Sequence, residues 1–156
     1  MAAAEGGNEE IFRAILDFSR KVWVKDRSGW TILHAAAAGG NAVIFDQLLR
    51  LDIDTTATDK NGNSVLVAAL KGKNRKILER CLDIGLDPDR ADVKGRTALM
   101  FASRQGDLGS VNVMLGYSGD LETRDADGLT AMDHAQRAGE IAIVALLDAE
   151  RAKRAD

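Results

Sequence analysis

The residues that could supply nucleophilic chemistry are Cys81, Ser103 and Ser110, with His34 and His134 as the available imidazoles. A Ser or Cys nucleophile needs a base within hydrogen-bond reach, and the base needs a third group that orients it. Metal binding would instead need histidine, cysteine or carboxylate ligands at short helical spacings. The two histidines lie 100 residues apart in the sequence, so no metal site is predicted.

The elements that must position these residues follow from an internal repeat. The tetrad Asp-x-x-Gly recurs at a fixed interval of 33 residues. A period of this length is typical of an array in which one small unit is stacked on the next. The four tetrads begin at Asp26, Asp59, Asp92 and Asp125.

One unit can be worked out from its first copy. Asp26 and Gly29 suit the first and last positions of a type I turn. Thr31 is a good N-cap for an alanine-rich helix that Gly39-Gly40 ends, and apolar residues at three- and four-residue spacing predict a second helix from about Ala42 to Leu51. A polar return over 52–58 leads to the next turn. Each unit is therefore a hairpin turn and two antiparallel helices, which must stack to bury their apolar faces.

The string Thr-Ile-Leu-His-Ala-Ala over 31–36 resembles the ankyrin repeat family, whose motif is Thr-Pro-Leu-His-x-Ala with the same period. The later copies at 64–69, 97–102 and 130–135 keep the Ser or Thr cap and a Leu or Met two residues later. This resemblance implies an all-α solenoid forming one domain over 1–156. It comprises a partial repeat (1–25), three full repeats (26–58, 59–91 and 92–124) and a fourth full repeat with a C-terminal cap (125–156). The residues expected to be inaccessible to solvent are Leu33, Leu66, Leu99 and Met132.

The repeat disfavours catalysis, because equivalent positions lie on the same layer of successive units and do not gather a nucleophile, a base and an orienting group. The resemblance implies a structural, hydrogen-bonding role for His34 at its helix start. No enzymatic activity, cofactor or metal is expected, and Cys81, which aligns with Leu48, Met114 and Leu147, is expected in the core.

The composition of the chain indicates the compartment in which the protein is expected. No apolar run approaches the length of a membrane span, and no signal peptide is evident. A single cysteine excludes an intrachain disulfide and favours a reducing compartment. We therefore expect an intracellular, cytoplasmic monomer. The start of the chain resembles the inside of a repeat, which favours a segment excised from a longer protein over a shortened natural cap.

The resemblance also implies a concave partner-binding face, formed by the second, third, fifth, thirteenth, fourteenth and last positions of each repeat. In this chain those 26 positions hold nine basic and two acidic residues, so the face carries +7 while the whole chain carries −3. Trp30 lies at a turn tip, and exposed tryptophan and arginine are enriched in binding hot spots. Phe101 is predicted on the same side. The expected partner-binding residues are Arg27, Trp30, Lys60, Lys71, Lys94, Arg96, Phe101, Arg104, Arg124 and Arg137.

Two functions fit this face. The first is an adaptor or scaffold that docks an acidic segment of a partner protein and performs no chemistry. The second is binding of nucleic acid or another polyanion through the same charges, with Trp30 available for base stacking. The strongly acidic remainder of the surface and the lack of further aromatic residues among the charges favour the protein partner.

Overall fold

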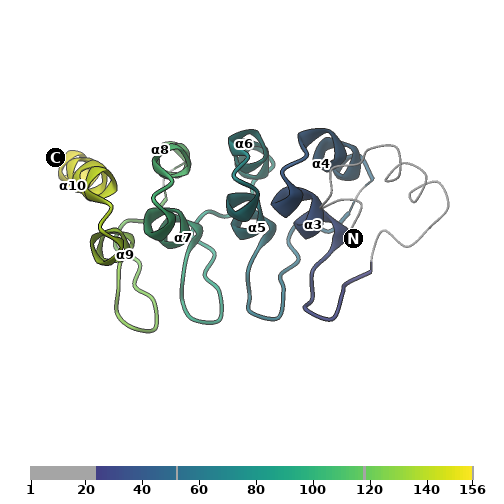
Figure 1. The fold of residues 1–156 in the computed structure, drawn as a ribbon, viewed down its shortest axis with the longest axis horizontal. Coiled ribbons are helices and arrows are strands. Elements are labelled where there is room, and N and C mark those ends of the chain that lie inside the picture. Colours follow the sequence, from purple (N-terminus) through teal and green to yellow (C-terminus); the bar gives the residue numbers. More distant parts are fainter. Residues whose placement is uncertain (1–23, 52, 118, 156) are drawn as a thin grey trace. The chain divides into compact units, whose positions relative to one another are not determined.

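The computed structural model describes residues 24–51, 53–117 and 119–155. These residues form α-helices and turns, without a strand (Figure 1). They divide into two compact units, a first unit ending at Leu86 and a second unit beginning at Asp87. The predicted partial repeat at 1–25 lies outside the described residues, except for residues 24 and 25.

The described helices come in pairs, two such pairs in each unit. The second helix of each pair lies on the side away from the turn tips (Figure 1). Within the first unit, the helices are α3 (Ile32–Gly39), α4 (Ala42–Leu49), α5 (Val65–Gly72) and α6 (Arg75–Asp83). Within the second unit, they are α7 (Ala98–Gln105), α8 (Leu108–Gly116), α9 (Ala131–Ala138) and α10 (Ile141–Ala155).

The first helix of a pair begins at the predicted Ser or Thr. Thr31 caps α3 by accepting a hydrogen bond from the backbone N–H of His34, and the His34 side chain returns to the Thr31 backbone. Thr130 and Asp133 form the same reciprocal capping box at α9. Ser64 begins α5 without a side-chain cap bond. These local bonds satisfy backbone donors that a helix start otherwise leaves unpaired.

The corner inside each pair depends on one left-handed residue. Gly40, Gly106 and Gly139 occupy it with φ angles of 71°, 72° and 78°. Lys73 occupies the equivalent corner in the first unit with φ 50°, and it is the one non-glycine residue with positive φ among those described. The second helix of the first pair ends at Leu49, two residues before the predicted end, because Arg50 closes it as a C-cap.

Within each unit, apolar side chains fill the space between the two described helix pairs. Within each unit the first helices pack directly on one another, α3 against α5 and α7 against α9. Leu33, Leu66 and Leu99 are buried, as predicted, but Met132 is only partly buried. The core of the first unit includes Phe45, Leu70 and Ile77, and that of the second includes Met100, Met114 and Leu147.

Candidate functional site

The aspartate of each Asp-x-x-Gly tetrad holds its own turn together. One carboxylate oxygen of Asp92 accepts hydrogen bonds from the backbone N–H groups of Lys94 at 2.8 Å and Arg96 at 2.9 Å. Gly95 donates its N–H to the Asp92 carbonyl at 2.9 Å and adopts φ 74°. The turns at Asp26, Asp59 and Asp125 show the same bonds. The tips that carry the predicted basic residues are therefore rigid hydrogen-bonded turns.

Successive tips within a unit are also bonded to each other. In the first unit Lys60 N–H donates to the Ser28 carbonyl at 2.9 Å, and in the second Ala126 N–H donates to the Lys94 carbonyl at 2.8 Å. These bonds hold equivalent positions of consecutive tips in register. Side chains at the same position therefore form short rows across the unit.

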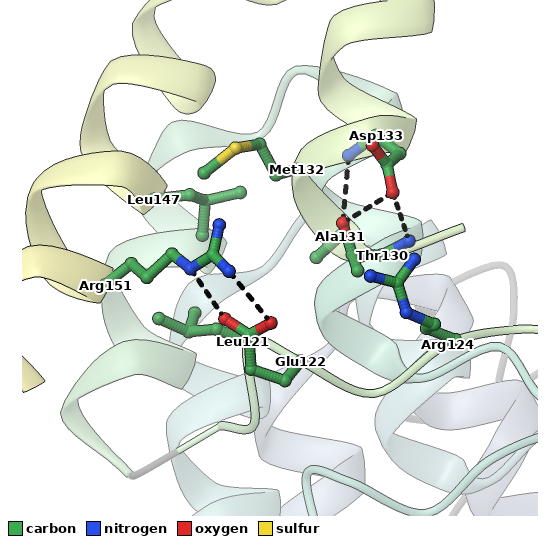
Figure 2. Close-up of a pocket in the computed structure, with 9 residues that line it drawn as sticks. All are labelled: Leu121, Glu122, Arg124, Thr130, Ala131, Met132, Asp133, Leu147 and Arg151. Atoms are coloured by element: carbon green, nitrogen blue, oxygen red, sulfur yellow. Dashed lines mark hydrogen bonds and ion pairs between the residues drawn. The ribbon is translucent and has the colours of Figure 1, made fainter. Parts of the chain in front are cut away.

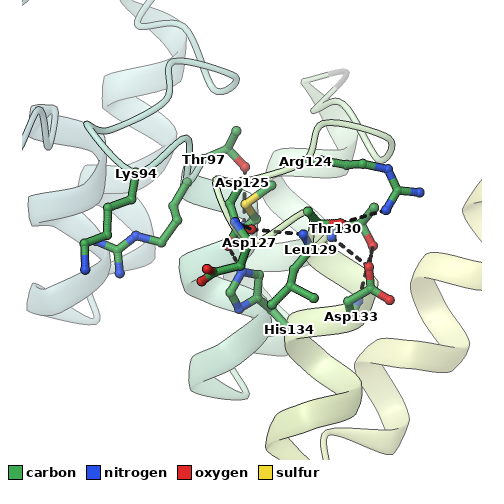
Figure 3. A network of polar contacts seen from close by, with 12 residues as sticks. Lys94, Thr97, Arg124, Asp125, Asp127, Leu129, Thr130, Asp133 and His134 are labelled. Carbon is green, nitrogen blue, oxygen red and sulfur yellow. Dashed lines mark hydrogen bonds and ion pairs between the residues drawn. The ribbon is translucent and has the colours of Figure 1, made fainter.

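The second carboxylate oxygen of the buried aspartates binds a further side chain. In the second unit, the Arg96 guanidinium donates to Asp92 Oδ2 at 2.6 and 2.9 Å. His134 Nε2 lies 2.7 Å from Asp125 Oδ2 (Figure 3). Burial opposes ionisation of Asp92, but the hydrogen bonds from Arg96 and Lys94 prevail and hold its pKa below the ordinary value. The turn carboxylate is therefore a buried anchor for residues on the face, a role that the sequence did not indicate.

Trp30 is anchored in the same way. Its indole N–H lies 3.3 Å from Asp59 Oδ2, in the following turn of the first unit. Its ring stacks on His34 with centroids 6.0 Å apart, and Lys71 Nζ lies 5.1 Å from the ring centroid. The tip tryptophan is therefore partly buried and contacts the fold through its ring and its N–H, whereas the sequence offered little structural reason for it.

Phe101 lies between two arginines in the second unit. The Arg96 guanidinium carbon is 4.7 Å from the ring centroid and that of Arg104 is 5.7 Å from it. Such distances allow cation–π attraction to the ring. Because Arg96 is already paired with Asp92, Arg104 is the member of this group whose charge has no ion-pair partner among the described residues.

The remaining basic residues among the ten expected partner-binding residues divide by their contacts. Arg124 donates to the Gly128 carbonyl at 2.8 Å, which ties it to its own turn. The other five, like Arg104, are exposed and form no ion pair with described residues. They are Arg27, Lys60 and Lys71 in the first unit and Lys94 and Arg137 in the second.

Basic residues elsewhere are more often paired with carboxylates. Arg80 on α6 pairs with Asp46 on α4 at 3.3 Å, and Arg151 on α10 pairs with Glu122 at 2.9 Å. Arg154, also on α10, pairs with Glu150 at 2.9 Å. The turn tips and first helices therefore present cations whose charge the described fold leaves uncompensated.

The serine and cysteine residues that could have supplied a nucleophile are buried in the structure. Cys81 is fully buried, and burial raises the pKa of its thiol to about 12. Ser103 and Ser110 are buried on α7 and α8, and Ser110 donates to Asp107 at 2.6 Å. Across the described part of the chain, no group of three or more potential metal ligands gathers.

His34 has a structural role. Its Nε2 lies 3.3 Å from the Asn63 carbonyl, which can only accept, so Nε2 carries the proton. Its Nδ1 then accepts from Thr31, with Thr31 Oγ1 at 2.8 Å and Thr31 N at 3.3 Å. Burial is the main cause that lowers the pKa of His34, so the neutral ring is favoured. The ring links one helix start to the following turn.

A pocket of about 140 Å³ in the second unit was not expected from the sequence (Figure 2). Leu121, Met132 and Leu147 supply apolar walls, and the ion pair of Arg151 with Glu122 lies at its edge. The equivalents of Met132 and Leu147 one repeat earlier are Leu99 and Met114, both buried. The pocket therefore lies on a side of α9 and α10 whose equivalent on α7 and α8 is covered. This difference explains why Met132 is only partly buried.

No helix among the described residues combines the length and the apolar character that a membrane crossing requires. None of the curated proteins compared with the chain matches it.

The hairpin turns, paired helices and capping boxes agree with a family comparison. A model of the family described as "Ankyrin repeats (3 copies)" matches residues 1–92 and again residues 65–154. These matches together extend over nearly the entire sequence, including the described turns at Asp26, Asp59, Asp92 and Asp125. The chain belongs to the ankyrin repeat family.

Proposed function

We propose that this protein is an adaptor that docks an acidic segment of a partner protein on the basic tips and first helices of its repeats and performs no chemistry. Ankyrin repeats are generally protein–protein interaction modules. The proposal includes four full 33-residue repeats after a partial repeat, forming one domain over 1–156, in a monomeric intracellular protein.

The observation that carries this proposal is the set of exposed cations without an ion-pair partner among the described residues. Lys60 and Lys71 belong to this set in the first unit, and Lys94, Arg104 and Arg137 in the second. Unpaired charges on a rigid surface attract a complementary partner and raise the association rate, and rim charges contribute more to rate and specificity than to affinity.

The contacts of the aromatic residues argue against nucleic acid as the partner. Single-stranded nucleic acid is bound by stacking its bases on open aromatic faces. Trp30 stacks on His34 and has Lys71 over its ring, and Phe101 has Arg96 and Arg104 on its ring. Basic side chains therefore lie over these rings and leave less of each ring free for stacking with a base.

The test is a binding titration of the intact chain with a fluorescent glutamate-rich peptide and, separately, with a single-stranded RNA of equal charge. We expect the peptide to bind and its affinity to fall as salt rises, because exposed charges are screened. Replacing Lys94 and Arg104 with glutamate should weaken peptide binding by about tenfold or more, which corresponds to about 1.4 kcal/mol.

Lys76→Glu is the control for a charge reversal outside the predicted face, because Lys76 is exposed on α6, the second helix of its pair. Arg96 is left intact because it neutralises the buried Asp92. Binding of the RNA in preference to the peptide would favour the polyanion alternative. Equal peptide binding by the parent and the double variant would exclude this surface as the docking face.

A further inference from the structure

The second unit presents two arginines at equivalent places on neighbouring helices. Arg104 on α7 and Arg137 on α9 are separated by one repeat of 33 residues, and the bounds of the two helices are related by the same shift. The bond from Ala126 N–H to the Lys94 carbonyl holds the two preceding turns in register. Because neighbouring packed helices lie about 8–10 Å apart, the two Cα atoms are separated by about that distance.

Arg104 and Arg137 form a row of two positive charges along the first helices of this unit. At the turn tips, the exposed Lys94 has the acidic Asp127 at the equivalent position of the next turn, so the tip row is close to neutral. Along the helices, Arg104 and Arg137 are both exposed and neither forms an ion pair with a described residue. An acidic ligand is therefore attracted to the helix row more strongly than to the tip row.

Contacts with neighbouring side chains partly order Arg104. The Arg104 guanidinium lies against Phe101, whose other neighbour Arg96 is paired with the buried Asp92. This packing restricts the directions in which Arg104 extends, so less side-chain entropy is lost when it binds a carboxylate. Asp133 stands one helical turn before Arg137 and attracts it, but the Asp133 carboxylate is held by Thr130 in the capping box and forms no ion pair with Arg137.

The spacing of the row matches one conformation of an acidic chain. Closely spaced carboxylates repel one another, which disfavours a helix and keeps the segment extended. In a polyproline II conformation, with three residues per turn and a rise of about 3.1 Å per residue, residues three apart lie on the same side and about 9 Å from each other. This distance agrees with the separation of α7 and α9.

We propose that the second unit recognises acidic segments in which carboxylates are three residues apart, in a polyproline II conformation, with Arg104 and Arg137 each binding one carboxylate. This inference rests on the proposed docking of an acidic segment and adds the pattern of acidic residues that the partner carries.

The experiment compares two labelled peptides of the same composition and charge, titrated against the intact chain at low salt. The matched peptide repeats Glu-Pro-Ala, which places a glutamate at every third residue. In the mismatched peptide the spacing of the glutamates alternates between two and four residues. We expect the matched peptide to bind about fivefold tighter, which is the contribution of one additional well-placed exposed ion pair.

Two variants locate the effect. Arg137→Gln should remove the preference, so that both peptides bind with similar, weaker affinity, while the control Lys76→Gln should keep it. Equal binding of the two peptides to the parent would overturn the spacing inference and leave the proposed function standing. Binding of neither peptide would overturn the proposed function itself. A preference that survives Arg137→Gln would overturn the assignment to this pair of arginines.

Discussion

At the scale of single residues, the buried turn aspartates connect the fold to the proposed binding face. Asp92 uses one carboxylate oxygen for its turn and the other for Arg96, and Asp125 divides its oxygens between its turn and His134. A buried carboxylate that loses such a partner keeps its desolvation cost without compensation. Residues that are adjacent on the face can therefore differ greatly in their effect on stability.

Arg96 and Arg104 provide a direct comparison, because both contact Phe101. Arg96→Ala should lower the free energy of unfolding by about 1–3 kcal/mol, since it leaves Asp92 Oδ2 unpaired. Arg104→Ala should change it by less than about 0.5 kcal/mol, as expected for an exposed side chain. Urea denaturation of the two variants measures the difference. Equal losses would mean that the pairing of Arg96 with Asp92 does not stabilise the turn.

The lowered pKa of His34 should make the free energy of unfolding depend on pH. Its folded pKa lies below the ordinary value of 6.5, chiefly because of burial, so below that pH the unfolded chain binds more protons than the folded chain. Stability should therefore fall as pH drops through 6.5. The turn aspartates Asp59 and Asp92 have lowered pKa values, so their contribution persists there and is lost only as the pH falls below the ordinary aspartate value of 3.8.

The check is the urea midpoint of the parent and of His34→Gln between about pH 7.5 and 5, on either side of the ordinary histidine pKa. Glutamine can still donate to the Asn63 carbonyl but does not titrate. The variant should show a shallower dependence on pH than the parent. The same slope in both proteins would show that protonation of His34 is not linked to unfolding.

At the scale of elements, the corner between the two helices of a pair has a glycine with positive φ in three of the described pairs and Lys73 in the fourth. Gly40, Gly106 and Gly139 adopt left-handed φ angles that cost glycine little, whereas Lys73 adopts φ 50° with a side chain. The residue before Lys73 is also constrained, because a Cβ on Gly72 would overlap the backbone oxygen of Ala37. Both neighbouring positions of this corner therefore favour glycine, position 73 because of its φ angle and position 72 because a side chain has no space there.

Two substitutions at this corner should have opposite effects on stability. Lys73→Gly should raise the free energy of unfolding by about 0.5–1 kcal/mol by relieving the left-handed strain. Gly72→Ala should lower it by about 1–3 kcal/mol, because the backbone of α3 would have to move. Thermal unfolding followed by circular dichroism compares the variants. A loss of stability in Lys73→Gly would contradict the strain argument.

At the scale of the whole molecule, an ankyrin array is stabilised mainly by contacts between successive repeats. Leu66 is buried in the first unit and Leu99 at the equivalent place in the second. The free energy of such an array is approximately a sum of repeat and nearest-neighbour contributions. A destabilising substitution should therefore lower stability most in its own repeat and in the adjacent repeats.

Leu66→Ala should cost about 2–5 kcal/mol through the cavity that it leaves, and should accelerate amide exchange in α3 to α6 more than in α7 to α10. Leu99→Ala should show the reverse pattern and serves as the control. Hydrogen exchange resolved by peptide measures both. Equal acceleration in all described helices would mean that the protein opens as one cooperative body.

The repeat, the turns and the helix pairs were determined by the sequence alone. The reason is that their causes are local. Asp92 bonds to backbone groups two and four residues later, and Thr31 caps a helix that begins at the next residue. Short-range rules of this kind, repeated at a fixed period, also identified the family and the burial of Leu33, Leu66 and Leu99.

The side-chain partners of Trp30 and His134 were decided only by the tertiary structure. Trp30 and Asp59 lie 29 residues apart in sequence and meet because successive turns stack, and the pairing of His134 with Asp125 depends on how α9 returns over its own turn. The partial exposure of Met132 depends on what covers α9 and α10, which no pattern within one repeat encodes. Periodicity predicts where a side chain stands, whereas its charge balance and burial depend on neighbours that stacking brings together.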